Sequence, residues 1–120
     1  MHLDFMRDHS TAFSKNEIDS ILSVGRSLEN IGVRNWALEQ EAALAALDQL
    51  SAIGVAVLGG DVYAVSGSNV ESNYDNWYCN RESNETEIDF IKRSVAKAKS
   101  YIANYQITAG SVLFAIVPSV

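Results

Sequence analysis

The chain has 120 residues, of which 48% are hydrophobic and 20% are charged, a composition typical of one globular domain and not of a disordered chain. The formal net charge of −6 makes a phosphate backbone an unexpected partner, and the single cysteine excludes an internal disulfide framework and a multi-cysteine zinc site. No apolar stretch approaches the ~20 residues of a membrane span, and the charged N-terminus lacks a signal peptide's apolar core, so we expect a cytoplasmic protein.

The first expected helix begins at a capping box, in which Ser14 and Glu17 can satisfy each other's free backbone donors. Its apolar face is formed by Ile18, Ile21, Leu22, Gly25 and Leu28. We expect Gly32 to end this helix and residues 35–38 to follow as a short apolar link. Residues 1–13 precede the capping box, and whether this segment is mobile stays open.

A second helix is expected over residues 39–53, after which the composition changes to that of a sheet. The apolar face of this helix is formed by Ala43, Ala46, Leu47 and Leu50, and Gly54 ends it. The expected strands cover residues 55–58, 62–65 and 70–79. Paired glycines permit positive φ, so residues 59–61 (Gly-Gly-Asp) predict a turn, and residues 66–69 predict another.

The third expected helix begins near Asn84, a suitable cap, with acidic residues first and basic residues later, as the helix dipole favours. Its apolar stripe is formed by Ile88, Ile91, Val95, Ala98, Ile102 and Tyr105. The apolar residues 112–117, closed by Pro118, predict a strand in the centre of the sheet. This order predicts an α+β fold: one domain over residues 1–120, with about three helices packed on a mostly antiparallel sheet.

Groups suited to catalysis or metal binding are sparse. Cys79 could pair with His2 or His9 as a nucleophile, but nothing in their spacing fixes such a geometry, so we interpret Cys79 as a small hydrophobic residue of a strand. Asp61, Asp75 and the two histidines lack the spacing of a metal site. We assign no catalytic residue, metal or cofactor. A small hydrolase using Asp61, Asp75 and Cys79 stays open as an alternative.

Residues 73–81 form the densest cluster of aromatic and charged side chains. If Asp75 and Trp77 share one face of a strand, the other face holds Tyr74, Asn76 and Tyr78. At least one aromatic ring is therefore expected at the surface, where tyrosine, tryptophan and arginine are favoured anchors of protein interfaces. The alternative is a sheet face whose aromatic rings simply cover a helix.

Three short strings occur here in the same order as in a known family: residues 36–38 (WAL), 57–63 (VLGGDVY) and 74–79 (YDNWYC). In them the chain resembles immunity protein family 40 of bacterial polymorphic toxin systems, over about residues 30–105. The resemblance implies a non-enzymatic protein that binds the C-terminal domain of a cognate toxin and blocks it. The family's motif positions fall on Gly59, Gly60, Asp61, Tyr63, Tyr74, Asp75, Trp77 and Tyr78. Whether they contact the toxin or hold the fold stays open.

The charge balance suits a basic protein partner, since residues 1–80 hold 11 acidic and 4 basic side chains. Plain solubility would explain the same balance. We predict an acidic, aromatic partner-binding surface formed by Asp61, Tyr63, Glu71, Tyr74, Asp75, Trp77 and Tyr78. The partner is expected to be the toxin domain, with no nucleic acid or membrane partner. The alternative is an interaction or regulatory domain of another partner, including a homodimer through the apolar C-terminal strand.

Overall fold

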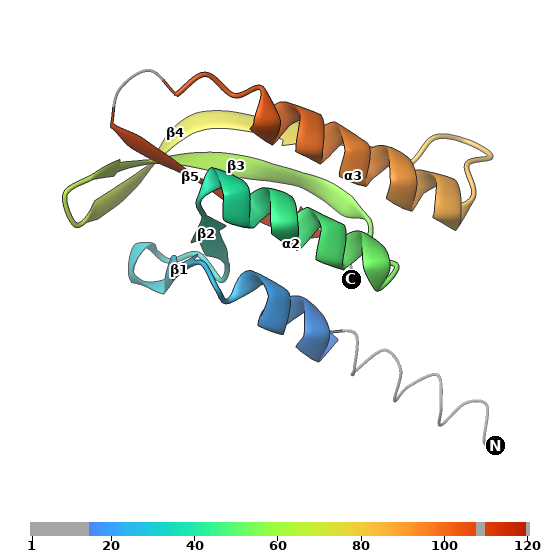
Figure 1. Ribbon diagram of the computed structural model, residues 1–120, viewed down its shortest axis with the longest axis horizontal. Helices are drawn as coiled ribbons and strands as arrows, with labels where there is room; N and C mark the ends of the chain where they lie inside the picture. The colour runs from blue at the N-terminus through green and yellow to red at the C-terminus, as the bar shows by residue number, and fades with distance from the viewer. Residues whose placement is uncertain (1–14, 108–109, 120) are drawn as a thin grey trace.

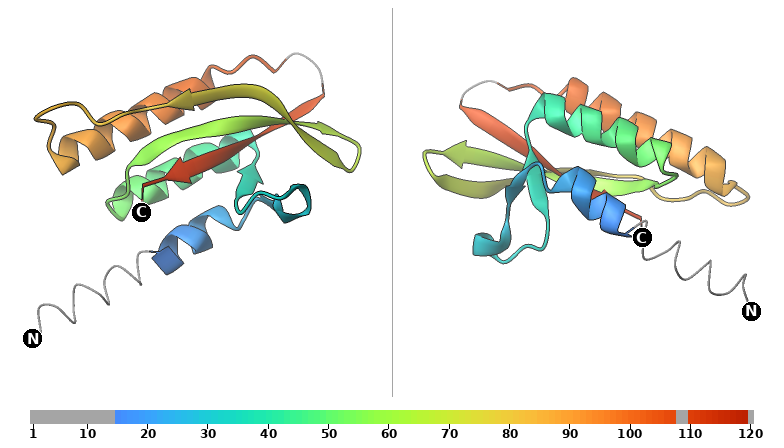
Figure 2. Two further views of the ribbon diagram at one scale, coloured as in Figure 1. Left: turned by 180° about the vertical axis from the view of Figure 1, so that it is seen from behind. Right: turned by 60° about the horizontal axis from the view of Figure 1, so that its bottom comes forward.

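The computed structural model describes residues 15–107 and 110–119. A helix over residues 15–22 is followed by β1 (Arg26–Ser27), the 3-10 helix η1 (Glu29–Ile31), β2 (Trp36–Leu38), α2 (Gln40–Ala52), β3 (Val57–Ser66), β4 (Asn69–Tyr78), α3 (Glu87–Ala103) and β5 (Ser111–Pro118). The strands form one antiparallel sheet in the order β1-β2-β5-β3-β4. Helices α2 and α3 lie side by side on one face, and the first helix runs beside α2 (Figures 1 and 2). The predicted α+β fold is confirmed.

The second and third expected helices are present, with differences at the ends of α3. Gly54, just after α2, has a φ of +76°, which glycine adopts without strain. Helix α3 is capped by Thr86 and not by Asn84, because the Thr86 hydroxyl accepts a hydrogen bond from a first-turn backbone N–H at 3.1 Å. The predicted apolar stripe was wrong at Ile88, which is 65% exposed, because the buried face of α3 runs through Phe90 instead.

The first helix is much shorter than predicted, and its capping residue Ser14 lies outside the described residues, as do residues 1–13. The helix ends at residue 22, and the chain then forms β1 and η1. Gly32, with a φ of +83°, ends η1 and not the helix. Leu28 is buried on the opposite face of the sheet, so it is not part of a helical stripe. The expected link over residues 35–38 contains β2, which pairs with both β1 and β5.

The turn predicted at residues 59–61 is instead part of one continuous strand, β3, which pairs with β4 on one edge and β5 on the other. Gly60 is required there by close packing, since a Cβ would lie 2.6 Å from Cζ2 of Trp77. The turn at residues 66–69 is confirmed, with a φ of +62° at Gly67. Strand β5 is central, as predicted. It pairs with β2 at Phe114 and Ala115 on one edge and with β3 on the other edge.

Apolar side chains fill both faces of the sheet. The main core lies between the sheet and the helices and includes Leu47, Trp77 and Phe114. A smaller cluster on the other face includes Tyr63 and Leu113, against which Leu28 packs. The β3–β4 hairpin is thus supported by buried side chains on both of its faces, which gives the exposed residues on it fixed positions.

Candidate functional site

The seven residues predicted to bind a partner lie on the β3–β4 hairpin, and the structure divides them by burial. Tyr63 and Trp77 are only 6% and 5% exposed, so they pack inside the protein. The exposed members are Asp61, Glu71, Tyr74, Asp75 and Tyr78. We call these five side chains the hairpin surface. Among the seven predicted residues, only these five side chains are accessible to a partner.

The hairpin surface includes side chains from both faces of the sheet. Asp61 precedes Val62, which packs toward the helices, so Asp61 points to the opposite face. Asp75 points to the helix side, where its Oδ2 accepts a hydrogen bond from the Tyr105 hydroxyl at 2.6 Å. Trp77 packs on this same side, so Asp75 and Trp77 do share a face. Asp75 lies on the edge strand β4 and Asp61 on the neighbouring strand β3, so the two carboxylates lie near one edge of the sheet but on opposite faces.

Strand β4 bulges around Tyr74. Residues 72–76 of β4 stand opposite only residues 61–63 of β3, so the chain of β4 is longer between the paired positions. At the bulge Tyr74 has a φ of +70°, a conformation that costs a bulky residue about 1–2 kcal/mol. Its side chain is 86% exposed. The bulge therefore presents an aromatic ring to solvent in a conformation that the surrounding structure must hold in place.

Tyr105, which follows α3, holds this bulge. Its hydroxyl donates to Asp75 Oδ2 and accepts a hydrogen bond from Asn73 Nδ2 at 2.9 Å. The hydrogen bond to Asp75, and then burial, raise the pKa of Tyr105 above its ordinary value, so the hydroxyl stays protonated at neutral pH. The ring packs edge-on against Phe114, with 5.5 Å between ring centroids. We call Asn73, Asp75 and Tyr105 the bulge clamp. The sequence indicated Tyr105 only as an apolar helix position.

Three exposed apolar side chains lie around Gly59 on the hairpin. Gly59 pairs with Tyr78 of β4 and with Val117 of β5. Tyr78 is 65% exposed and Val117 38%, and Leu58, next to Gly59 in the chain, is 43% exposed. The ammonium group of Lys97 lies 5.3 Å from the centre of the Tyr78 ring. Sequence reasoning missed Leu58 and Val117, because both stand in apolar runs typical of buried strands.

The hairpin is acidic and carries no cation of its own. Residues 57–78 contain three carboxylates and no lysine, arginine or histidine. Elsewhere in the described part of the chain, ion pairs join Arg81 to Glu87, Arg93 to Glu85 and Lys99 to Asp48. The negative charge of the hairpin is therefore available to attract a basic partner.

A comparison with protein families bears on this arrangement. The family model described as Immunity protein 40 matches residues 27–118, which include the hairpin surface and the bulge clamp. The chain belongs to this family. No curated protein and no solved structure gives a significant match. The resemblance in the three short strings is therefore confirmed over most of the chain.

In this Immunity protein 40 family member, Cys79 does not join the two carboxylates of the hydrolase alternative. It is 2% exposed and packs against Ala56 and Phe90. Nη1 of Arg93 donates a hydrogen bond to its Sγ at 3.2 Å. Asp61 and Asp75 point to opposite faces of the sheet, so the structure does not gather the nucleophile and the carboxylates of that alternative.

Cys79 is expected to react with the thiol reagent DTNB only when the protein opens, because a buried thiol is not accessible to the reagent. The native protein should react about 100-fold more slowly than the same protein in urea, as followed by the absorbance of the released thiolate. Equal rates in the two conditions would contradict the burial of Cys79.

Arg93 connects α3 to Cys79 and to the segment after β4. Its guanidinium group bonds both carboxylate oxygens of Glu85, at 2.7 and 2.8 Å, and also donates to the Asn80 carbonyl at 2.6 Å. The hydrogen bonds from Arg93 lower the pKa of Glu85 to about 2. This network joins the segment after β4 to α3.

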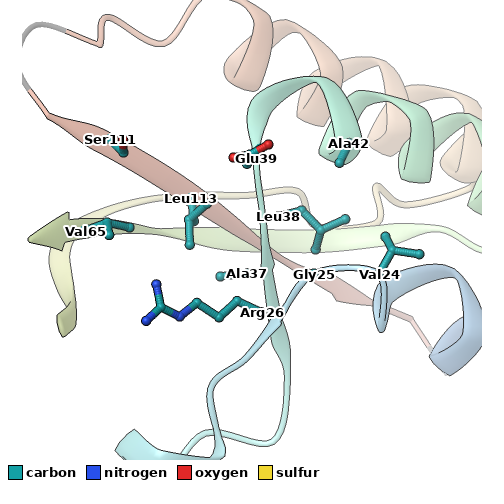
Figure 3. Close-up of a pocket in the computed structure, with 10 residues that line it drawn as sticks. All are labelled: Val24, Gly25, Arg26, Ala37, Leu38, Glu39, Ala42, Val65, Ser111 and Leu113. Atoms are coloured by element: carbon teal, nitrogen blue, oxygen red, sulfur yellow. The ribbon is translucent and has the colours of Figure 1, made fainter. Parts of the chain in front are cut away.

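A cleft of about 350 Å³ opens between β1, β2 and the start of α2 (Figure 3). It is lined by Val24, Gly25, Arg26, Ala37, Leu38, Glu39, Ala42, Val65, Ser111 and Leu113. Arg26 Nη2 donates to the Ser68 carbonyl at 2.8 Å, which ties this cleft to the hairpin turn. A Cβ at Gly25 would lie 2.7 Å from the carbonyl oxygen of Ala37. The lining contains neither cysteine nor histidine and is mainly aliphatic.

The described residues offer neither a metal-binding cluster nor a membrane-spanning helix. Within residues 15–107 and 110–119, no three histidine, cysteine, aspartate or glutamate residues are grouped so that they could hold a metal ion. In the same part of the chain, no helix has the length and hydrophobicity needed to cross a membrane.

Proposed function

We propose that this chain is an immunity protein that binds a cognate toxin domain in the cytoplasm of the cell that makes both, and blocks it without catalysis. Membership of the Immunity protein 40 family carries this proposal. An acidic, exposed hairpin is consistent with it, since a protein inhibitor needs an accessible surface with its own chemical character. The hydrolase alternative is disfavoured by the separation of its residues.

The hairpin surface is the part of the molecule that we propose binds the toxin. Tyr74 and Tyr78 are exposed aromatic side chains on one edge strand, and aromatic anchors commonly dominate the energetics of interfaces. Asp61 and Glu71 lie on the same hairpin, whose sequence (residues 57–78) contains no lysine, arginine or histidine. Their charge would speed association with a basic surface and would fix the orientation of the two proteins. Tyr63 and Trp77 support this surface from inside.

Tyr74→Ala is expected to weaken toxin binding by about 30-fold or more, because truncation of an interface anchor removes about 2 kcal/mol or more. The measurement is calorimetric titration with the toxin C-terminal domain encoded by the neighbouring reading frame, inactivated by mutation. The native chain should bind it with a nanomolar Kd.

Ile88→Ala is the matched control, since Ile88 is 65% exposed on α3 and lies outside the hairpin. This variant should bind as the native chain does. No binding of the native chain at micromolar concentration, with both proteins folded, would contradict the proposed function for this toxin. Equal losses in Tyr74→Ala and Ile88→Ala would contradict the proposed role of the hairpin surface.

A further inference from the structure

An open depression of about 560 Å³ lies where the bulge of β4 meets the C-terminal end of α3. It is lined by Asp75, Ser100, Tyr101, Asn104, Tyr105 and Gln106. We infer that this depression receives a lysine or arginine side chain of the toxin, which pairs with Asp75 next to the exposed Tyr74. The inference rests on the proposed function and adds the chemistry of the contact.

The depression is suited to a cation for two independent reasons. Asp75 supplies a carboxylate that, within the described residues, is bonded by the Tyr105 hydroxyl and has no cationic partner. The end of α3 supplies the negative end of a helix dipole, and the last turn of α3 contains no basic residue that would compensate it. The positive charge of an arginine or lysine side chain would be attracted both by the Asp75 carboxylate and by the C-terminal end of α3.

The bulge clamp keeps this carboxylate in position before the partner arrives. Tyr105 is itself fixed, because its ring packs against Phe114 and lies 5.9 Å from the ring of Tyr101. The Tyr105 hydroxyl bonds Asp75 and Asn73 on either side of Tyr74 in the chain, so the clamp fixes the bulge that presents the tyrosine ring. Preorganisation of this kind favours binding because less conformational entropy is lost in the complex. Tyr105 is therefore a positioning residue for the Asp75 carboxylate.

The exposed ring of Tyr74 restricts the toxin surfaces that would fit this part of the hairpin. Tyr74 is 86% exposed and precedes Asp75 in the chain, so a partner that covers the bulge would meet an aromatic ring as well as the carboxylate. The fitting toxin surface is thus a basic side chain next to an apolar patch.

Asp75→Asn tests the inference, because the amide oxygen can still accept the Tyr105 hydrogen bond while the charge is removed. We expect toxin binding to weaken about tenfold at low salt, with a smaller loss at high salt, where ion pairs are screened. Glu41→Gln removes an exposed carboxylate at the start of α2 and should leave the Kd unchanged. Thermal unfolding checks that each variant is folded, and Asp75→Ser repeats the test if asparagine disturbs the bulge.

Tyr105→Phe tests the positioning role, since it removes the hydroxyl and keeps the ring. We expect a loss of about fivefold in the native background and less than about twofold in the Asp75→Asn background. An equal loss in both backgrounds would overturn the role of Tyr105 in positioning the Asp75 charge, because an effect that does not act through this charge would be additive. If the native chain binds the toxin and Asp75→Asn binds it with the same Kd, the cation site is overturned and the proposed function still holds. Failure of the native chain to bind would overturn both.

Discussion

Gly60→Ala is expected to lower the free energy of unfolding by about 3 kcal/mol or more, the upper end of the range for overpacked sites. A Cβ at this position would lie 2.5 Å from the carbonyl oxygen of Ala115 and would also overlap the indole ring of Trp77. Neither neighbour can move easily. Ala115 belongs to the central strand β5, and Trp77 is held in the main core.

The measurement for Gly60→Ala is urea unfolding followed by circular dichroism. The matched control is Gly67→Ala in the hairpin turn, where no atom of the described residues lies within 4 Å of an added Cβ and a φ of +62° opposes the substitution. The control should cost about 1–2 kcal/mol, the penalty for a left-handed conformation. Equal stabilities of the two alanine variants would show that close packing is not what requires glycine in β3.

The elements with a strong local pattern were predictable from the sequence. Helix α2 is rich in alanine and leucine and ends at Gly54, and both features act within a few residues. The turn between β3 and β4 was also predictable, because it depends on a local feature, the positive φ of Gly67. The central position of β5 followed from its continuous apolar character, which an exposed edge strand would not tolerate.

The elements set by distant contacts were not predictable. Strand β2 has only 3 residues, and it exists because Ala37 and Leu38 pair with β5, far away in the sequence. Gly59 and Gly60 have the local signature of a turn. Their actual role is to let Trp77 and the neighbouring backbone approach, and this depends on residues that come 17 or more positions later. Paired glycines can mark either a turn or a close approach of neighbouring chains, and the local sequence does not distinguish the two.

The candidate site was predictable in its composition and not in its geometry. The cluster of aromatic and acidic residues around Tyr74 was visible in the sequence. The alternation of side chains along a strand could not say which face Trp77 occupies. The bulge changes the register within β4, so no fixed alternation describes the whole strand. Tyr105 could not be assigned to the site, because its contact with Asp75 joins residues 30 positions apart.

Trp77→Ala is expected to destabilise the protein by about 3–5 kcal/mol, as for other large-to-small changes of buried aromatic residues. The indole stacks on Tyr101 with 4.9 Å between ring centroids, and it covers Gly60. Trp77→Phe should cost less than half as much. A phenyl ring keeps part of the stacking, and the indole Nε1, buried without a hydrogen-bond partner in the described structure, is removed.

Binding by the Trp77→Phe variant separates the two roles that a motif residue can have. Because Trp77 is only 5% exposed, we expect folded Trp77→Phe to bind the toxin domain within about threefold of the native chain, less than the loss at an interface anchor. Urea unfolding gives the stability of each variant, and titration under conditions in which it is fully folded gives its affinity. A loss of stability with retained affinity would assign Trp77 to the scaffold that holds Tyr74 and Asp75. A folded variant with a tenfold weaker Kd would instead require the indole to act on the partner, either directly or through the shape of β4.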